Sequence, residues 1–258
     1  MQLSACWRCQ PSAAAAAAPA RRALLLPTPR RPCRRRWASS SSKAAWLASV
    51  KSDYHGNRAK RQGFRSRAAA KLEQLDDRFR LLRPGCTVVE LGAAPGSWTQ
   101  LAVQRVNASD ATASRGKRGR VIAADINRMD PVPGATVLQL DLTEPRDIST
   151  LRSHLPASED RCCNVLLSDM APATTGQHAL DHHRSMVLGS IALRLSRELL
   201  SPGGSAVVKL FQGGGERRLL QWAKQHFETA RFAKPPGSKK KSKEVFLVAT
   251  GFQPPPPS

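Results

Sequence analysis

The stretch TVVELGAAPGSW, residues 87–98, decides the fold. It starts as an apolar, β-branched run that is typical of a buried strand, passes through a glycine-containing turn, and continues into a segment with helical spacing. Glycines at such a turn let a ligand approach the backbone, and the N–H groups of the next helix face that ligand. The spacing Gly92-x-x-x-Gly96 differs from the dinucleotide fingerprint G-x-G-x-x-G, so it disfavours a nicotinamide dehydrogenase.

Strand-like and helix-like segments alternate along the rest of the chain. This alternation predicts an α/β fold with a mostly parallel sheet that helices cover on both faces. The expected strands are residues 87–91, 121–125, 137–141, 165–169, 206–210 and 245–250, with a further strand at 227–234 that makes the sheet seven-stranded. The expected helices are residues 66–79, 98–106, 147–154, 184–200 and 217–227.

Charged side chains stand at the ends of several expected strands. They are Glu90, Asp125, Asp141, Asp169 and Lys209. Ligands of open parallel sheets bind beyond the carboxyl ends of the strands. An acid before the turn suits a cationic ligand such as S-adenosylmethionine, whose ribose hydroxyls and adenine amino group would face Asp125 and Asp141. A tight structural turn with solvated acids is the alternative.

Five segments carry a resemblance to a known family. They are SRAAAKL (66–72), ELGAAPGSWTQ (90–100), SDMAP (168–172), PGGSAVVKLFQG (202–213) and SKEVFLVAT (242–250). In this order and spacing, across about residues 53–252, the chain resembles the FtsJ/RrmJ family of RNA 2′-O-ribose methyltransferases. The likeness is greatest to the mitochondrial branch, which methylates a uridine of large-subunit ribosomal RNA. It implies a Rossmann-like, S-adenosylmethionine-dependent methyltransferase fold.

The resemblance also implies the site residues. The family's catalytic tetrad corresponds to Lys71, Asp169, Lys209 and Glu244, with Lys209 as the general base or the group that steers the hydroxyl. No metal is required, because the sulfonium supplies the electrophile. The implied S-adenosylmethionine contacts are Pro95, Gly96, Ser97, Trp98, Asp125, Asp141 and Asp169. The chain departs from the family pattern at three positions: Glu90 replaces Asp, Ala173 replaces Asn, and Ala70 replaces an aromatic residue.

The N-terminal 52 residues differ in composition from the rest of the chain. They hold ten basic residues and no acid, because the first carboxylate is Asp53. An Arg-, Ala- and Ser-rich segment without acids is typical of an organelle import peptide, and a disordered basic arm that touches RNA is the alternative. We therefore expect a mitochondrial transit peptide at 1–52, a methyltransferase domain at 53–252, a disordered tail at 253–258, and a location in the mitochondrial matrix.

The charge of the chain indicates a polyanionic partner. The formal net charge is +22, of which +12 falls outside the first 52 residues. Basic residues flank the expected tetrad at Lys60, Arg61, Arg65 and Arg67 and in the run 239–243, which favours phosphate contacts. We expect ribosomal RNA of the mitochondrial large subunit, within a pre-ribosomal particle, as the partner, and no apolar run is long enough to span a membrane. Transfer RNA or a cap as substrate, and an assembly factor that acts mainly by binding RNA, are the alternatives.

Overall fold

The computed structural model describes residues 58–59, 61–109, 116–156, 162–238 and 241–255. The expected import peptide, the end of the C-terminal tail, and three of the expected phosphate contacts (Lys60, Lys239 and Lys240) lie outside these residues. Among the described residues, no helix is both long enough and apolar enough to cross a bilayer.

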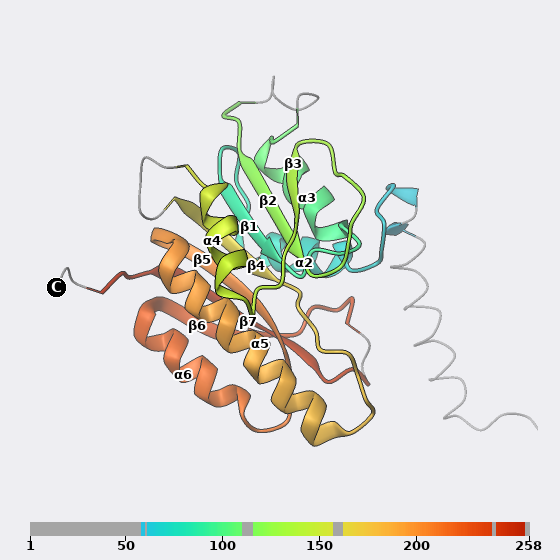
Figure 1. Ribbon diagram of the computed structural model, residues 1–258, viewed down its shortest axis with the longest axis vertical. Coiled ribbons are helices and arrows are strands. Elements are labelled where there is room, and N and C mark those ends of the chain that lie inside the picture. Colours follow the sequence, from blue (N-terminus) through green and yellow to red (C-terminus); the bar gives the residue numbers. More distant parts are fainter. Residues whose placement is uncertain (1–57, 60, 110–115, 157–161, 239–240, 256–258) are drawn as a thin grey trace, which may run out of the picture.

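A seven-stranded sheet forms the centre of the molecule, as the sequence predicts (Figure 1). Its order is β3-β2-β1-β4-β5-β7-β6. The first five strands of this order pair in parallel, and β7 pairs antiparallel with both β5 and β6. The strands are β1 (Thr87–Leu91), β2 (Arg120–Asp125), β3 (Ala135–Gln139), β4 (Cys163–Ser168), β5 (Leu200–Phe211), β6 (Phe227–Ala233) and β7 (Glu244–Phe252).

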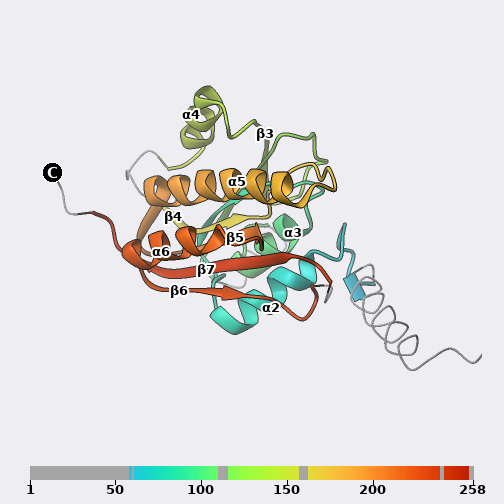
Figure 2. The same ribbon diagram turned by 90° about the horizontal axis from the view of Figure 1, so that it is seen from below.

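Helices cover both faces of the sheet (Figure 2). Leu151, Leu193 and Ala223, from α4, α5 and α6, pack on one face, and Leu72 and Leu101, from α2 and α3, pack on the other. The helices are α2 (Ala69–Phe79), α3 (Ser97–Val106), α4 (Pro145–Ser153), α5 (His178–Leu199) and α6 (Glu216–His226). Because both faces are covered, the central strands are apolar almost without interruption, which explains the run at residues 87–91.

Some element boundaries differ from the sequence expectation. Strands β3 and β4 end at Gln139 and Ser168, so Asp141 and Asp169 follow their strands rather than end them. Helix α5 begins at His178, six residues before the expected start. Polar residues in its first two turns, among them Asp181 and His182, conceal the helical pattern, and the Asp181 carboxylate accepts hydrogen bonds from the Thr175 and Gly176 N–H groups.

Candidate active site

The direction of β7 brings residues from both ends of the chain to one edge of the sheet. Because β7 runs antiparallel to β5, its first residue, Glu244, pairs in register with Phe211 at the end of β5. Glu244 therefore lies at the carboxyl edge of the parallel strands, beside Lys209. Lys71, near the start of α2, reaches the same edge from the helix layer.

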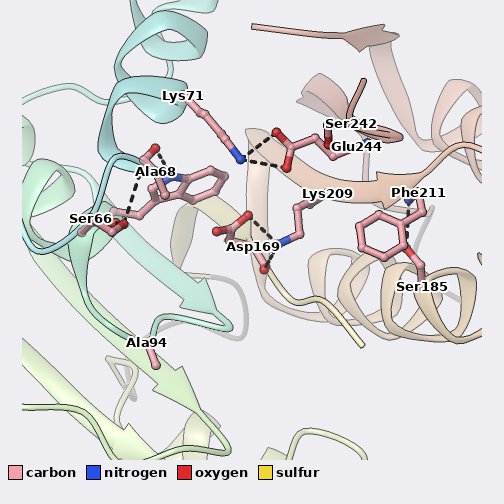
Figure 3. A network of polar contacts seen from close by, with 12 residues as sticks. Ser66, Ala68, Lys71, Ala94, Asp169, Ser185, Lys209, Phe211, Ser242 and Glu244 are labelled. Atoms are coloured by element: carbon pink, nitrogen blue, oxygen red, sulfur yellow. Dashed lines mark hydrogen bonds and ion pairs between the residues drawn. The ribbon is translucent and has the colours of Figure 1, made fainter. Parts of the chain in front are cut away.

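The four expected tetrad residues form two ion pairs (Figure 3). The ammonium nitrogen of Lys71 lies 2.6 Å from Oε1 and 2.8 Å from Oε2 of Glu244. The ammonium nitrogen of Lys209 lies 2.8 Å from Oδ1 of Asp169 and also donates to the Asp169 backbone carbonyl. Each lysine side chain is only 10–13% exposed, so both charges are held by their partners rather than by solvent.

The charges at this edge influence one another. Burial raises the pKa of Glu244, but the hydrogen bond and the charge of Lys71, with a smaller contribution from Lys209, outweigh burial and hold that pKa below its ordinary value. Glu244 is therefore ionised at neutral pH and fixes the ammonium of Lys71 in place. This edge of the sheet therefore holds two cations, each oriented by a carboxylate.

A cavity of about 520 Å³ opens next to Lys209. This volume lies within the range of ~300–1,000 Å³ that is usual for small-molecule sites. Three carboxylates face it, together with an apolar wall from the loops after β2, β3 and β4 and from α5. Its lining includes Gly92, Ala94, Asp125, Ile126, Asn127, Asp141, Leu142, Asp169, Met170, Ile191 and Lys209.

Asp125 holds the two loops that border this cavity. Its Oδ2 accepts a hydrogen bond of 2.9 Å from the Ala94 N–H, and its Oδ1 accepts one of 2.7 Å from the Asn127 N–H. The carboxylate thus joins the turn after β1 to the loop after β2. Oδ1 also accepts a hydrogen bond of 3.1 Å from the Asn127 side-chain amide, so Oδ2 is the oxygen that keeps a further lone pair for a hydroxyl donor.

Asp141 is oriented by its neighbours on the loop before α4. Its Oδ1 accepts hydrogen bonds from the Thr143 hydroxyl, at 2.7 Å, and from the Thr143 N–H, at 2.9 Å, and these bonds lower the pKa of Asp141. The Asp141 N–H donates to Oδ2 of Asp147 at 2.6 Å. The carboxylate is therefore ionised at neutral pH and ready to accept an amino group.

The expected contacts at residues 95–98 are placed differently. The Trp98 ring is 1% exposed, packs 5.8 Å from the Phe246 ring, and donates from Nε1 to the Ala68 carbonyl. The Ser97 hydroxyl lies 2.8 Å from that of Ser66. None of Pro95, Gly96, Ser97 or Trp98 lines the 520 Å³ cavity, and their contact with a ligand stays a prediction.

Glu90 is buried behind the cavity, between β1 and α3. Its side chain is 1% exposed, and Oε2 accepts a hydrogen bond of 2.6 Å from the Thr99 hydroxyl, whereas Oε1 has no hydrogen-bond partner among the residues that the structure describes. Burial raises the pKa of Glu90 to about 8, and the nearby charges of Asp169 and Asp125 add to the shift. Glu90 is therefore mainly protonated at neutral pH.

This shift predicts a pH-dependent stability. Below the ordinary pKa of 4.5, Glu90 is protonated in both the folded and the unfolded state. Between pH 4.5 and about 8 it is protonated only in the folded state. The contribution of Glu90 to the free energy of unfolding therefore falls as the pH rises through this window. Glu90→Gln removes that contribution. We expect urea midpoints measured from pH 5 to pH 8 to fall less steeply for the variant than for the wild type, and parallel pH profiles would contradict the burial of a neutral acid.

Two residues outside the tetrad make contacts that the sequence did not indicate. Arg65, an expected phosphate contact, donates from its guanidinium to three backbone carbonyls. His182 lies in α5, before the start of the helix that the sequence predicts. Its Nδ1 lies 2.8 Å from the Phe211 carbonyl, and its Nε2 accepts from the Gly215 N–H. Among the described residues, no group of three or more His, Cys, Asp or Glu side chains could hold a metal ion.

Sequence reasoning missed the apolar part of the cavity wall and the residues that hold the acids. Asn127, Thr143 and Asp147 orient Asp125 and Asp141, as described above. The Asx-type spacing of Asp125 to Asn127 and of Asp141 to Thr143 indicates the two local bonds. Ile191 carries no such indication, because it reaches the cavity from a helix that is distant in sequence.

Comparison with known proteins agrees with this geometry. A protein with 46% identity over 215 residues, covering 83% of each chain, is the ribosomal RNA large subunit methyltransferase E of Parvibaculum lavamentivorans. The protein of that name from Paramagnetospirillum magneticum is 46% identical over 220 residues, covering 85% of this chain and 86% of its own. A crystal structure of a Plasmodium falciparum protein assigned as a ribosomal RNA methyltransferase is 26% identical, with a TM-score of 0.63 over 74% of this chain and 100% of its own.

The family profile gives the same result over the part of the chain that carries the site. Residues 64–252 match the FtsJ-like methyltransferase profile, a span that holds all seven strands, both ion pairs and the acid-lined cavity. The chain belongs to the FtsJ-like methyltransferase family.

Proposed function

We propose that this protein transfers a methyl group from S-adenosylmethionine to the ribose 2′-hydroxyl of a uridine in the ribosomal RNA of the mitochondrial large subunit. The observation that carries the proposal is the pair of lysine–carboxylate ion pairs beside an acid-lined cavity. Two relatives that are 46% identical to this chain are named ribosomal RNA large subunit methyltransferase E, and this name supports ribosomal RNA as the class of substrate. The net charge of +22 supports a polyanionic substrate.

The cavity fits S-adenosylmethionine by the hydrogen-bond acceptors and the apolar side chains that line it. Asp125 and Asp141 offer carboxylate oxygens to ribose hydroxyls and to the adenine amino group, and Ile126, Leu142 and Met170 offer apolar contact to a flat ring. Asp169 and the loop at Gly92 border the end of the cavity that Lys209 reaches. The sulfonium of bound S-adenosylmethionine would supply an electrophilic methyl carbon, so the reaction needs no metal.

The chain's own residues would then act on the ribose hydroxyl. A ribose hydroxyl is a weak nucleophile that needs a base, correct alignment, or both. Lys209 lies at the junction of the cavity and the carboxyl edge. There it would direct the hydroxyl as the ammonium or, after it has lost a proton to solvent, accept the hydroxyl proton as the neutral amine. Asp169 fixes Lys209 through a side-chain oxygen and a backbone oxygen, and the Lys71–Glu244 pair would orient the ribose.

Asp125 provides a test of the cofactor site. Asp125→Ala should weaken S-adenosylmethionine binding by roughly 1–3 kcal/mol, because the ribose hydroxyls lose their hydrogen-bond acceptor. The N–H groups of Ala94 and Asn127, in the two bordering loops, also lose the carboxylate that accepts from both. Asp130→Ala is the matched control, since it removes an exposed carboxylate from the same loop and leaves the backbone unchanged. Unchanged affinity of a folded Asp125→Ala protein in calorimetry would contradict the assignment of the cavity.

The mitochondrial location rests on the acid-free, arginine-rich segment 1–52. A variant without residues 1–52 should methylate RNA in vitro but remain outside mitochondria in cells. Accumulation of this truncated protein in mitochondria, or retention of the full-length protein in the cytosol, would contradict import through this segment.

Mapping of 2′-O-methylation at nucleotide resolution, with and without the protein, tests the reaction and the substrate together. We expect one uridine of mitochondrial large-subunit RNA to lose its 2′-O-methyl group when the protein is absent. Loss of the mark from transfer RNA or a cap instead would show the same chemistry on another RNA. Normal ribosome assembly with a Lys209 variant would separate catalysis from a binding role.

A further inference from the structure

Arg65 connects two loops that border the cavity. Its Nη1 donates to the Pro95 carbonyl at 3.0 Å and to the Asp130 carbonyl at 2.7 Å, and its Nη2 donates to the Pro131 carbonyl at 2.7 Å. Its backbone N–H donates to Oε1 of Gln100 at 2.9 Å. A guanidinium is suited to this task because its planar fork presents several donors in fixed directions.

The absence of a side chain at Gly96 leaves space for the Arg65 guanidinium. Its φ is +105°, and a Cβ at this position would lie 2.7 Å from Nη1 of Arg65 and 3.0 Å from the sulfur of Met129. Any other residue would therefore displace the guanidinium as well as strain the backbone. The missing side chain at the turn makes room for Arg65, so this glycine serves packing between protein groups.

The residues after Arg65 continue the same contact toward the tetrad. The Ser66 hydroxyl meets that of Ser97 at 2.8 Å, and the Ala68 carbonyl accepts from Nε1 of Trp98 at 2.8 Å (Figure 3). Helix α2 begins at the next residue and carries Lys71 in its first turn. Hydrogen bonds of residues 65–68 therefore connect the turn after β1 to α2, the helix whose Lys71 pairs with Glu244.

The other side of the connection is the cavity wall. Ala94, next to Pro95, and Asn127, three residues before Asp130, both line the cavity, and both donate to Asp125. A ligand that occupies the cavity thus restrains the same two loops whose carbonyls Arg65 holds.

We infer that Arg65 is a positioning residue that couples cofactor binding to the placement of Lys71. The inference rests on the proposed function, because it takes S-adenosylmethionine as the occupant of the cavity. With the cofactor bound, the two loops keep their carbonyls at the positions where the guanidinium donates to them. The contacts of residues 66–68 then fix the position of the start of α2. Without Arg65, the loops and the helix lose their common link.

An exposed arginine beside the catalytic edge could instead bind an RNA phosphate, and the two roles predict opposite results for Arg65→Lys. Lysine keeps the positive charge but cannot reach three carbonyls from two loops in a planar fork. A positioning role therefore predicts that Arg65→Lys resembles Arg65→Ala. A phosphate contact predicts that Arg65→Lys resembles the wild type.

The experiment measures S-adenosylmethionine affinity by calorimetry without RNA, and RNA affinity over a series of salt concentrations. We expect both Arg65 variants to bind the cofactor at least about tenfold more weakly, while the salt dependence of RNA binding stays that of the control. Arg58→Ala is the control, because it removes an equal charge from the same segment, where Arg58 forms an exposed ion pair with Glu73. The control should bind the cofactor as the wild type does.

Hydrogen exchange supplies a measurement that a purely structural role would not change. In the wild type, S-adenosylmethionine should slow amide exchange across residues 66–72, and this cofactor-dependent protection should be lost in Arg65→Lys at saturating cofactor. Arg65→Lys with wild-type cofactor affinity and wild-type protection would overturn the inference and leave the proposed function intact. A wild-type protein that does not bind S-adenosylmethionine would instead overturn the proposed function.

Discussion

Lys209→Ala is expected to reduce methyl transfer by at least about a hundredfold, the low end of what a positioned general base contributes. Lys209 is the one tetrad lysine that lines the cavity, and Asp169 holds its ammonium at two oxygens. Single-turnover rates with saturating RNA and cofactor measure the effect directly. Cofactor affinity should change little, because Lys209 is assigned to the hydroxyl rather than to the adenosine.

Lys209→Arg distinguishes a base from a fixed charge. A guanidinium stays protonated and cannot accept the hydroxyl proton, so this variant should fail almost as badly as the alanine variant. RNA binding should persist in both variants, since it is spread over many phosphate contacts. Near-normal turnover of Lys209→Arg would limit Lys209 to alignment of the hydroxyl.

The Lys71–Glu244 pair is expected to act as a unit. Lys71→Ala and Glu244→Ala should each lower turnover by roughly tenfold to a hundredfold, because each leaves the other charge without the partner that orients it. The double variant should be little worse than the more impaired single variant, since residues that act together are strongly non-additive. The corresponding cycle on the exposed Arg58–Glu73 pair, which also involves α2, serves as the control and should leave turnover unchanged.

Additive losses in the Lys71–Glu244 cycle would contradict a shared role. Stability should follow the same order as turnover, since removal of one partner leaves a charge at a site where the side chains are only 12–13% exposed. Thermal unfolding of the four proteins in the cycle separates this structural cost from the loss of positioning.

The sequence predicted the sheet and its covered faces well, because these follow from local patterns. The tetrad was implied by the family resemblance instead; its four residues form two ion pairs, and their catalytic roles stay predictions. The apolar runs at 121–125 and 245–250 lie within β2 and β7, and Asp125 ends its strand as expected. Boundaries were less predictable where polar side chains bond to loop backbone, as Asp181 does at the start of α5. Asp141 lies just past its strand for a similar reason, since local bonds with Thr143 and Asp147 hold it. Asp169 follows β4 differently, because its N–H bonds to the Leu91 carbonyl and its carboxylate pairs with Lys209.

The role of residues 65–68 could not be predicted from the sequence. The acceptors of Arg65 are backbone carbonyls 30 to 66 residues away, and a carbonyl has no signature in the sequence. Trp98 illustrates the same difficulty from the other direction. The family resemblance implies a ligand contact at Trp98, which stays a prediction, but no pattern in the sequence indicates that its ring packs in the core under α2.

The position of β7 between β5 and β6 has a consequence for how the protein matures. Lys71 and Glu244 are 173 residues apart, so one half of the pair is absent until the last strand of the chain is in place. A growing chain exposes the edges of both β5 and β6 until β7 is added, and open strand edges favour aggregation. The addition of β7 therefore completes the Lys71–Glu244 pair and covers both strand edges in one late folding step. A chain that ends before Glu244 should be insoluble rather than weakly active.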